Sequence, residues 1–186
     1  MDFSREFGLR ADIVEKDYVL DWLLAGISNQ KELASAWVFK GGTCLKKCFF
    51  ETYRFSEDLD FTIIDPGYPD GEFPANVFKE IAGWVYEKTG IELPRDLIRF
   101  EVYTNPRGKL STEGRVSYRG PLQISSQRDL PRVKLETWPM TRFWCSNQTT
   151  VRFTTPIQTD QKMVSMFNVI ASRNFLQKRL EHWQNV

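Results

Sequence analysis

The chain has 186 residues, of which 41% are hydrophobic and 26% charged, and its formal net charge is +1. This balance predicts one water-soluble globular domain with a sizeable core and excludes a disordered or fibrous protein. No apolar stretch approaches the roughly 20 residues that a membrane-spanning helix needs, and no basic-then-apolar leader opens the chain, so we expect no membrane partner. Three cysteines without a C-x-x-C pair predict neither a disulfide framework nor a zinc site, and they favour the reducing cytoplasm.

The charges are unevenly distributed along the chain. Residues 1–94 hold 10 Lys or Arg against 17 Asp or Glu, a net charge of -7, whereas residues 95–152 hold 11 against 5, a net charge of +6. A basic second half suits a phosphate-rich ligand, although dispersed, solvated charges on strands and loops explain it equally well.

Helical and strand patterns alternate through the first half of the chain. An apolar stripe predicts a helix from about Asp12 to about Ser28. The apolar run 37–39 predicts a buried strand that ends at two glycines, and a helix with Thr43 at or near its cap should follow. Residues 58–64 alternate between apolar and polar side chains and predict a strand with one polar face. A third helix should end near Gly90.

The second half is mainly strand by its pattern. We expect strands at about 97–103, 115–118 and 132–137, and residues 139–158 have too weak a periodicity to assign. A last helix from about Thr159 would place four apolar residues on one face, namely Met163, Met166, Phe167 and Ile170. The order of elements predicts an α/β (α+β) fold in which helices pack against a mixed sheet. We divide it into a core, residues 1–158, and a short C-terminal helical segment, residues 159–186.

The segment from residue 40 to residue 60 contains the residues that suggest a catalytic or ligand-binding site. Gly41 and Gly42 lie between a strand and a helix, where they let a ligand approach the backbone. The start of that helix offers free N–H groups and a positive dipole end to a phosphate. On the next strand, Asp58 and Asp60 project from one face, and such a pair can hold Mg²⁺ for phosphoryl or nucleotidyl transfer.

The order of these features is more specific than any one of them. A lone Gly-Gly is usually a turn, and an Asp-x-Asp alone is most often a solvated edge. Arg54 and Ser56 lie just before the second strand, where a guanidinium and a hydroxyl group could bind the remaining phosphate oxygens. Together these residues predict a site for a nucleotide and a metal ion.

The chain resembles the AbiEii/AbiGii-type toxins, a family of the nucleotidyltransferase superfamily that includes DNA polymerase beta. The residues that carry the resemblance are Glu15-Lys16-Asp17-Tyr18-Val19-Leu20, Phe39-Lys40-Gly41-Gly42-Thr43-x-Leu45 and Arg54-Phe55-Ser56-Glu57-Asp58-Leu59-Asp60-Phe61. The resemblance implies a nucleotidyltransferase core joined to a C-terminal helical region, with Mg²⁺ or Mn²⁺ as cofactor. It also implies a nucleoside triphosphate as donor, an RNA (tRNA) or protein acceptor, and a protein antitoxin as partner.

The resemblance also implies roles for single residues. Asp58 and Asp60 would be catalytic metal ligands. The resemblance assigns nucleotide contacts to Gly42, Thr43, Arg54 and Ser56, and we add Lys40, Gly41, Lys46 and Lys134 to these candidates. The superfamily uses a third carboxylate on a later strand, and Glu136 is our candidate because strand alternation places it on one face with Lys134. A routine charged strand surface explains Glu136 equally well, and Glu101 is the second choice.

The C-terminal part departs from the family pattern. Members usually continue into a Glu-Lys-x-x-Ala-like helix and an Arg-Asp-x-x-Asp-like motif, whereas this sequence offers Lys162 and no such acidic motif. The alternative is therefore a truncated, catalytically impaired member that binds a nucleotide or a partner. A third hypothesis is a basic RNA-binding protein without transfer activity. His182 is the only histidine and lies near the C-terminus, which argues against a Ser-His-Asp or Cys-His hydrolase.

Overall fold

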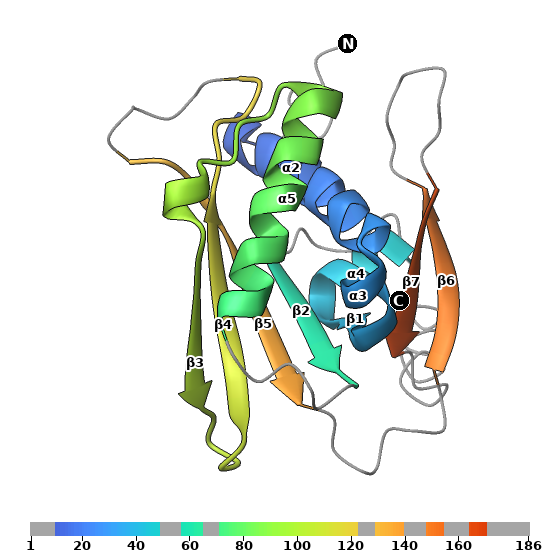
Figure 1. The fold of residues 1–186 in the computed structure, drawn as a ribbon. Coiled ribbons are helices and arrows are strands. Elements are labelled where there is room, and N and C mark those ends of the chain that lie inside the picture. The colour runs from blue at the N-terminus through green and yellow to red at the C-terminus, as the bar shows by residue number, and fades with distance from the viewer. Residues whose placement is uncertain are drawn as a thin grey trace.

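The computed structural model describes residues 10–48, 57–64, 71–122 and 129–139, and the backbone of the strands at 148–154 and 164–170. Within these residues, seven strands form one open mixed sheet in the order β3-β4-β5-β2-β1-β7-β6 (Figure 1). The strands are β1 (Trp37–Lys40), β2 (Asp58–Ile63), β3 (Arg99–Thr104), β4 (Leu110–Ser117), β5 (Arg132–Pro139), β6 (Gln148–Thr154) and β7 (Val164–Ile170). The predicted fold class, a mixed sheet with helices against it, is confirmed.

Helices α2 and α5 pack across one face of this sheet (Figure 1). The described helices are α2 (Ala11–Asn29), α3 (Lys31–Ala36), α4 (Gly41–Cys48), α5 (Glu72–Thr89) and the short 3-10 helix η1 (Arg95–Leu97). Gly26 lets α2 approach α5, since a Cβ at this position would lie 2.5 Å from Cγ2 of Ile81. None of the described helices combines the length and apolar character needed to cross a membrane.

Alternation along the central strands separates the core from a polar face. Leu59 and Phe61 of β2 are fully buried, as are Val133 and Leu135 of β5. Phe78 of α5 packs onto this layer through the rings of Trp37 and Phe100. The residues between them on the strands point the opposite way. We call that opposite side the polar face.

The predicted helix from Thr159 is wrong over residues 164–170, which form strand β7. This strand pairs in parallel with β1, at Phe39 and Val169, and antiparallel with β6 over its whole length. The run from Val164 to Ile170 is short and rich in apolar and β-branched residues, so its pattern fits a strand as well as a helix. The neighbouring strands decide between the two, because their N–H and C=O groups need partners. Residues 155–163 and 171–186 lie outside the described residues.

Other boundaries differ from the predicted ones in smaller ways. Strand β4 begins at Leu110 rather than near residue 115, and β6 lies in the segment that the pattern left unassigned. Helix α3 was not predicted because its six residues are too few to show a periodicity.

Glu15 joins the start of α2 to the loop after β4. Its side chain is buried, and its Oε1 accepts a hydrogen bond of 2.7 Å from the backbone N–H of Leu122. Glu15→Ala leaves this part-buried donor without its acceptor and is expected to lower the free energy of unfolding by about 1–3 kcal/mol, measured by urea denaturation. The control Glu32→Ala, on the exposed surface of α3, should change it by less than about 0.5 kcal/mol. Equal losses in both variants would contradict a role for this bond.

Candidate active site

Ionisable side chains from three neighbouring strands meet on the polar face. Asp60 of β2 pairs with Lys40 of β1 on one side and with Glu136 of β5 on the other. Asp58, two residues earlier on β2, pairs with Lys134. Paired residues on adjacent strands share a face, as do residues two apart on one strand. The structure therefore brings together five residues that the sequence predicted for the site.

Gly41 and Gly42, at the junction of β1 and α4, form what we call the glycine turn, and this turn lies directly beside Asp60. Gly41 has a φ of 79°, and a Cβ at this position would overlap Oδ2 of Asp60. Only glycine adopts this φ readily and also leaves room for the carboxylate. The carboxylate of Asp60 and the first turn of α4 are thus in direct contact, as expected for a site that uses both.

Thr43 fixes the distance between α4 and the strand that carries the aspartates. Its side chain is fully buried, and its Oγ1 donates a hydrogen bond of 2.5 Å to the backbone oxygen of Asp58. This bond ties the first turn of α4 to the first residue of β2. The predicted contact between Thr43 and a nucleotide stays a prediction.

The other side of α4 is held to α2 by ion pairs. The ammonium group of Lys46 lies 2.9 Å from Oδ1 of Asp17, and that of Lys47 lies 2.8 Å from Oδ2 of Asp17 and 2.7 Å from Asp21. Burial raises the pKa of Asp21 to about 6, while Lys47 opposes this shift. These contacts orient α4, and the nucleotide contact predicted for Lys46 stays a prediction.

Lys40 and Asp60 are paired neighbours in a partly buried environment. Burial lowers the pKa of Lys40, against the attraction of Asp60 and Glu136. Burial raises the pKa of Asp60, and the charges of Glu136 and Asp58 raise it further, while Lys40 opposes the shift. The Nζ of Lys40 also lies 5.3 Å from the ring centroid of Trp138. Asp60 therefore has charged neighbours of both signs, and its two neighbouring carboxylates favour binding of a cation there.

Glu136 is engaged by a lysine of its own strand. The Nζ of Lys134 lies 2.5 Å from Oε1 of Glu136 and 3.4 Å from Oε2 of Glu113 on β4. Glu113 also accepts a hydrogen bond of 2.8 Å from Arg115, which holds its pKa below the usual value. The hydrogen bond to Glu136 raises the pKa of Lys134. The positive charge of Lys134 is thus shared between the carboxylates of Glu136 and Glu113.

A row of carboxylates extends from β2 to the edge of the sheet. Asp60 pairs with Glu136, Glu136 with Glu113, and Glu113 with Glu101. The sequence predicted Glu136 and Glu101 as candidates but not Glu113, because the predicted strand began near residue 115 and β4 begins at Leu110. Had the strand been extended to residue 113, alternation would have placed Glu113 on the same face as Arg115.

The two aspartates fit a magnesium ion that shares its coordination with a nucleotide. Across the residues that the structure describes, no three His, Cys, Asp or Glu side chains are grouped closely enough to hold a metal ion. Mg²⁺ needs only one or two protein carboxylates when phosphates and waters complete its coordination. Asp58 is exposed and Asp60 is partly exposed, so both can reach such an ion. Glu136 as a third catalytic carboxylate stays a prediction.

Three predicted residues lie outside the described residues. Arg54 and Ser56 belong to the segment before β2, and Lys162 to the segment before β7. Their roles stay predictions.

Comparison with known families gives a match over most of the chain. The family model for the nucleotidyl transferase AbiEii toxin of type IV toxin–antitoxin systems matches residues 22–153. The matched region includes the glycine turn, both aspartates and Glu136. A search of curated proteins finds no match to the chain.

Proposed function

Because the chain belongs to the family of nucleotidyl transferase AbiEii toxins of type IV toxin–antitoxin systems, we propose that it transfers a nucleoside monophosphate from a nucleoside triphosphate to an acceptor hydroxyl group. The acceptor is an RNA, such as a tRNA, or a protein, and a cognate antitoxin protein is the expected partner in the cytoplasm. One observation carries the proposal: the carboxylate of Asp60 lies against Gly41 at the start of α4. A site of this chemistry needs a carboxylate and a phosphate-binding turn next to each other.

Asp58 and Asp60 would hold Mg²⁺ or Mn²⁺. When bound, the ion neutralises the negative charge of the triphosphate and makes the α-phosphorus a better electrophile. Burial raises the pKa of Asp60, and the charges of Glu136 and Asp58 add to the shift. This supports the assignment, because a partly buried carboxylate beside other carboxylates is stabilised by a nearby cation.

The first turn of α4 would bind the phosphates of the nucleotide. The backbone N–H groups of Gly41 and Gly42 begin the helix there, and the ammonium group of Lys40 adds a positive charge. Thr43 would act mainly by keeping this turn in place, since its hydroxyl group is bonded to β2. Arg54 and Ser56 would add contacts to the remaining phosphate oxygens.

Glu136 would take the proton during transfer. The oxygen of the acceptor hydroxyl forms a bond to the α-phosphorus, and the bond from that phosphorus to the bridging oxygen breaks. Pyrophosphate leaves with the electron pair, and the hydroxyl proton passes to the carboxylate of Glu136. Its place opposite Asp60 on β5 supports this role, and Lys134 balances its charge.

The proposal is tested with the same nucleoside triphosphate labelled at either its α- or its γ-phosphate. The purified chain is incubated with Mg²⁺, each nucleotide in turn, and total RNA or total protein as acceptor. We expect the α-label, and not the γ-label, in one acceptor fraction. Chelation by EDTA should reduce this labelling to background, and excess Mg²⁺ should restore it.

Three results would speak against the proposal. Transfer of the γ-label would indicate a kinase, and labelling that persists in EDTA would exclude the role of the metal. Tight, Mg²⁺-dependent nucleotide binding without transfer to any acceptor would support the alternative, a nucleotide-binding module.

A further inference from the structure

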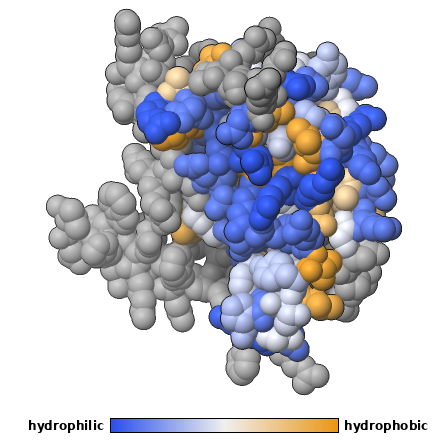
Figure 2. All heavy atoms as spheres, turned by 90° about the vertical axis from the view of Figure 1, so that its left-hand side faces the viewer, coloured by the Kyte–Doolittle hydropathy of each residue, from blue (hydrophilic) through white to orange (hydrophobic). Residues whose placement is uncertain are grey.

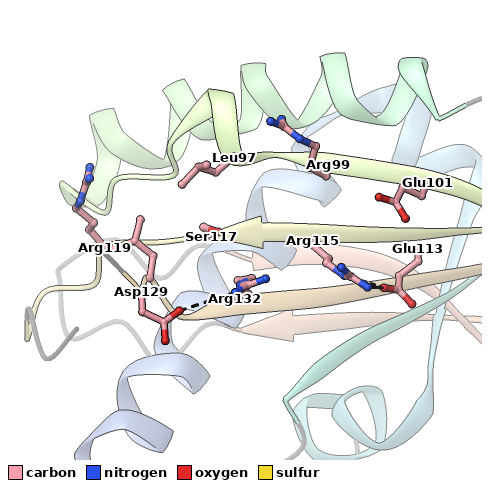
Figure 3. A pocket seen from close by; sticks show the side chains of 10 residues that line it. Leu97, Arg99, Glu101, Glu113, Arg115, Ser117, Arg119, Asp129 and Arg132 are labelled. Carbon is pink, nitrogen blue, oxygen red and sulfur yellow. Dashed lines mark hydrogen bonds and ion pairs between the residues drawn. The ribbon is translucent and has the colours of Figure 1, made fainter. Parts of the chain in front are cut away.

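An arginine pocket opens on the polar face, on the side of β5 away from the glycine turn. It has a volume of about 380 Å³ and takes side chains from β3, β4, β5 and the adjoining loops (Figure 3). Its four arginines are Arg99, Arg115, Arg119 and Arg132. Seen from the β3 side, the described part of the surface is largely hydrophilic (Figure 2).

Two of these arginines have hydrogen-bonding capacity to spare. Arg115 is paired with Glu113 at 2.7 Å and Arg119 with Glu92 at 2.6 Å. Arg132 has its nearest carboxylate at 3.8 Å, from the strongly exposed Asp129. Arg99 donates to the backbone oxygen of its neighbour Ile98 and forms no ion pair with any described residue. A guanidinium group has five N–H donors, so Arg99 and Arg132 can each bind another anion.

The position of the pocket separates it from the proposed nucleotide site. Asp58 pairs with Lys134, Lys134 with Arg115, and Arg115 with Arg99. Three strand spacings of about 4.8 Å place Arg99 roughly 14 Å from Asp58. The glycine turn follows β1, on the other side of β2 in the sheet order. The aspartates therefore lie between the glycine turn on one side and the arginine pocket on the other.

The charged groups of the pocket select the class of ligand. Guanidinium groups match phosphate geometry with two parallel hydrogen bonds. Arg132 pairs with Ser117, two residues beyond the Arg115 position on β4, so the arginines are spread along the strands as well as across them. A single phosphate would contact only part of such an array, whereas a chain of phosphates could follow it.

We propose that the arginine pocket binds the phosphodiester backbone of a single-stranded nucleic acid and guides its acceptor hydroxyl to Asp58 and Asp60. This inference rests on the proposed function and selects a nucleic acid over a protein as acceptor. The free donors of Arg99 and Arg132 make the contacts to phosphate. Three carboxylates, those of Glu101, Glu113 and Asp129, also line the pocket. They do not prevent binding, because Arg115 and Lys134 neutralise Glu113, and solvent surrounds Glu101 and Asp129.

The test is binding of a fluorescent 12-nucleotide RNA, and of DNA with the same sequence, measured by anisotropy without nucleotide or Mg²⁺. The double variant Arg99→Gln and Arg132→Gln should bind at least tenfold more weakly. Its slope of log affinity against log salt should decrease by about 1.4, because two phosphate contacts are lost. Arg99→Lys with Arg132→Lys keeps the charges but not the forked geometry, so its affinity should fall less and its salt slope should stay.

A matched control removes two positive charges elsewhere. Lys79→Gln with Lys88→Gln alters exposed residues of α5, which packs on the opposite face of the sheet, and should retain the affinity of the unmodified chain. Equal affinity for RNA and DNA supports backbone contacts, and tighter RNA binding adds contacts to the 2′-hydroxyl groups. The proposal is overturned if the Arg99→Gln and Arg132→Gln variant binds as tightly as the unmodified chain, or if the Lys79→Gln and Lys88→Gln control loses as much affinity as that variant. It is also overturned if the unmodified chain binds neither RNA nor DNA. Because no nucleotide is present, loss of transfer activity does not affect this test.

Discussion

Replacing Asp60 by asparagine is expected to slow nucleotide transfer by about a hundredfold or more, and to leave the free energy of unfolding unchanged or higher. Asparagine keeps the shape of the side chain but removes the negative charge that would hold the metal ion. In the folded chain this charge is unfavourable, because burial and two neighbouring carboxylates raise the pKa of Asp60. The proposed cation site would thus reduce stability while no cation is bound. Transfer of the α-label and urea denaturation measure the two effects.

The pH dependence of stability gives a second measure of the same variant. A raised pKa means that folded Asp60 holds its proton more tightly than unfolded Asp60 does. The unmodified chain therefore loses stability as pH rises from the unfolded value of 3.8 through the higher folded value. The Asp60→Asn variant does not lose stability in this way. The difference in free energy of unfolding between the variant and the unmodified chain should therefore increase between pH 3.8 and the higher folded pKa, and stay constant above it.

A control variant tests whether these effects are specific to Asp60 or follow from the loss of any acidic side chain. Glu87→Gln alters an exposed side chain of α5 and should retain both transfer and stability. If Asp60→Asn transferred label within threefold of the unmodified chain, Asp60 could not be a metal ligand in the reaction.

The sequence predicts which side chains share a face, because alternation along a strand is local. Leu59 and Phe61 point into the core, and Asp58 and Asp60 point away from it, as the pattern of β2 alone indicates. The glycine turn also follows from local sequence, because two consecutive glycines after a short apolar run indicate a turn. The fold class and the central part of the site follow from these short-range rules.

Pairing between distant strands does not follow from such rules. The parallel pairing of β2 with β5 puts Glu136 beside Asp60, and the pairing of β4 with β5 adds Glu113. Neither register is fixed by neighbouring residues. The ion pair of Lys46 with Asp17 has the same origin, because it depends on how α4 packs against α2. Strand β7 was missed for a related reason, since its partners β1 and β6 determine its structure.

Gly41→Ala is expected to impair both stability and transfer. A non-glycine residue with positive φ costs about 1–2 kcal/mol, and the new Cβ would also overlap the carboxylate of Asp60. Either the carboxylate or the first turn of α4 has to move. A displacement of about 1 Å in the groups that position the reactants can lower the rate about a hundredfold. Transfer of the α-label should therefore fall by about that factor. Urea denaturation should show a loss of at least about 1 kcal/mol.

Gly90 provides the matched control, because it has nearly the same backbone conformation without the contact. Its φ is 74°, and a Cβ there would meet nothing within 4 Å. Gly90→Ala should therefore show the backbone cost in stability and retain transfer. In a chain that already carries Asp60→Ala, the stability loss caused by Gly41→Ala should shrink toward the loss seen for Gly90→Ala, since most of the overlapping atoms are gone. If Gly41→Ala kept full transfer activity, close contact between the glycine turn and Asp60 could not be a requirement of the reaction.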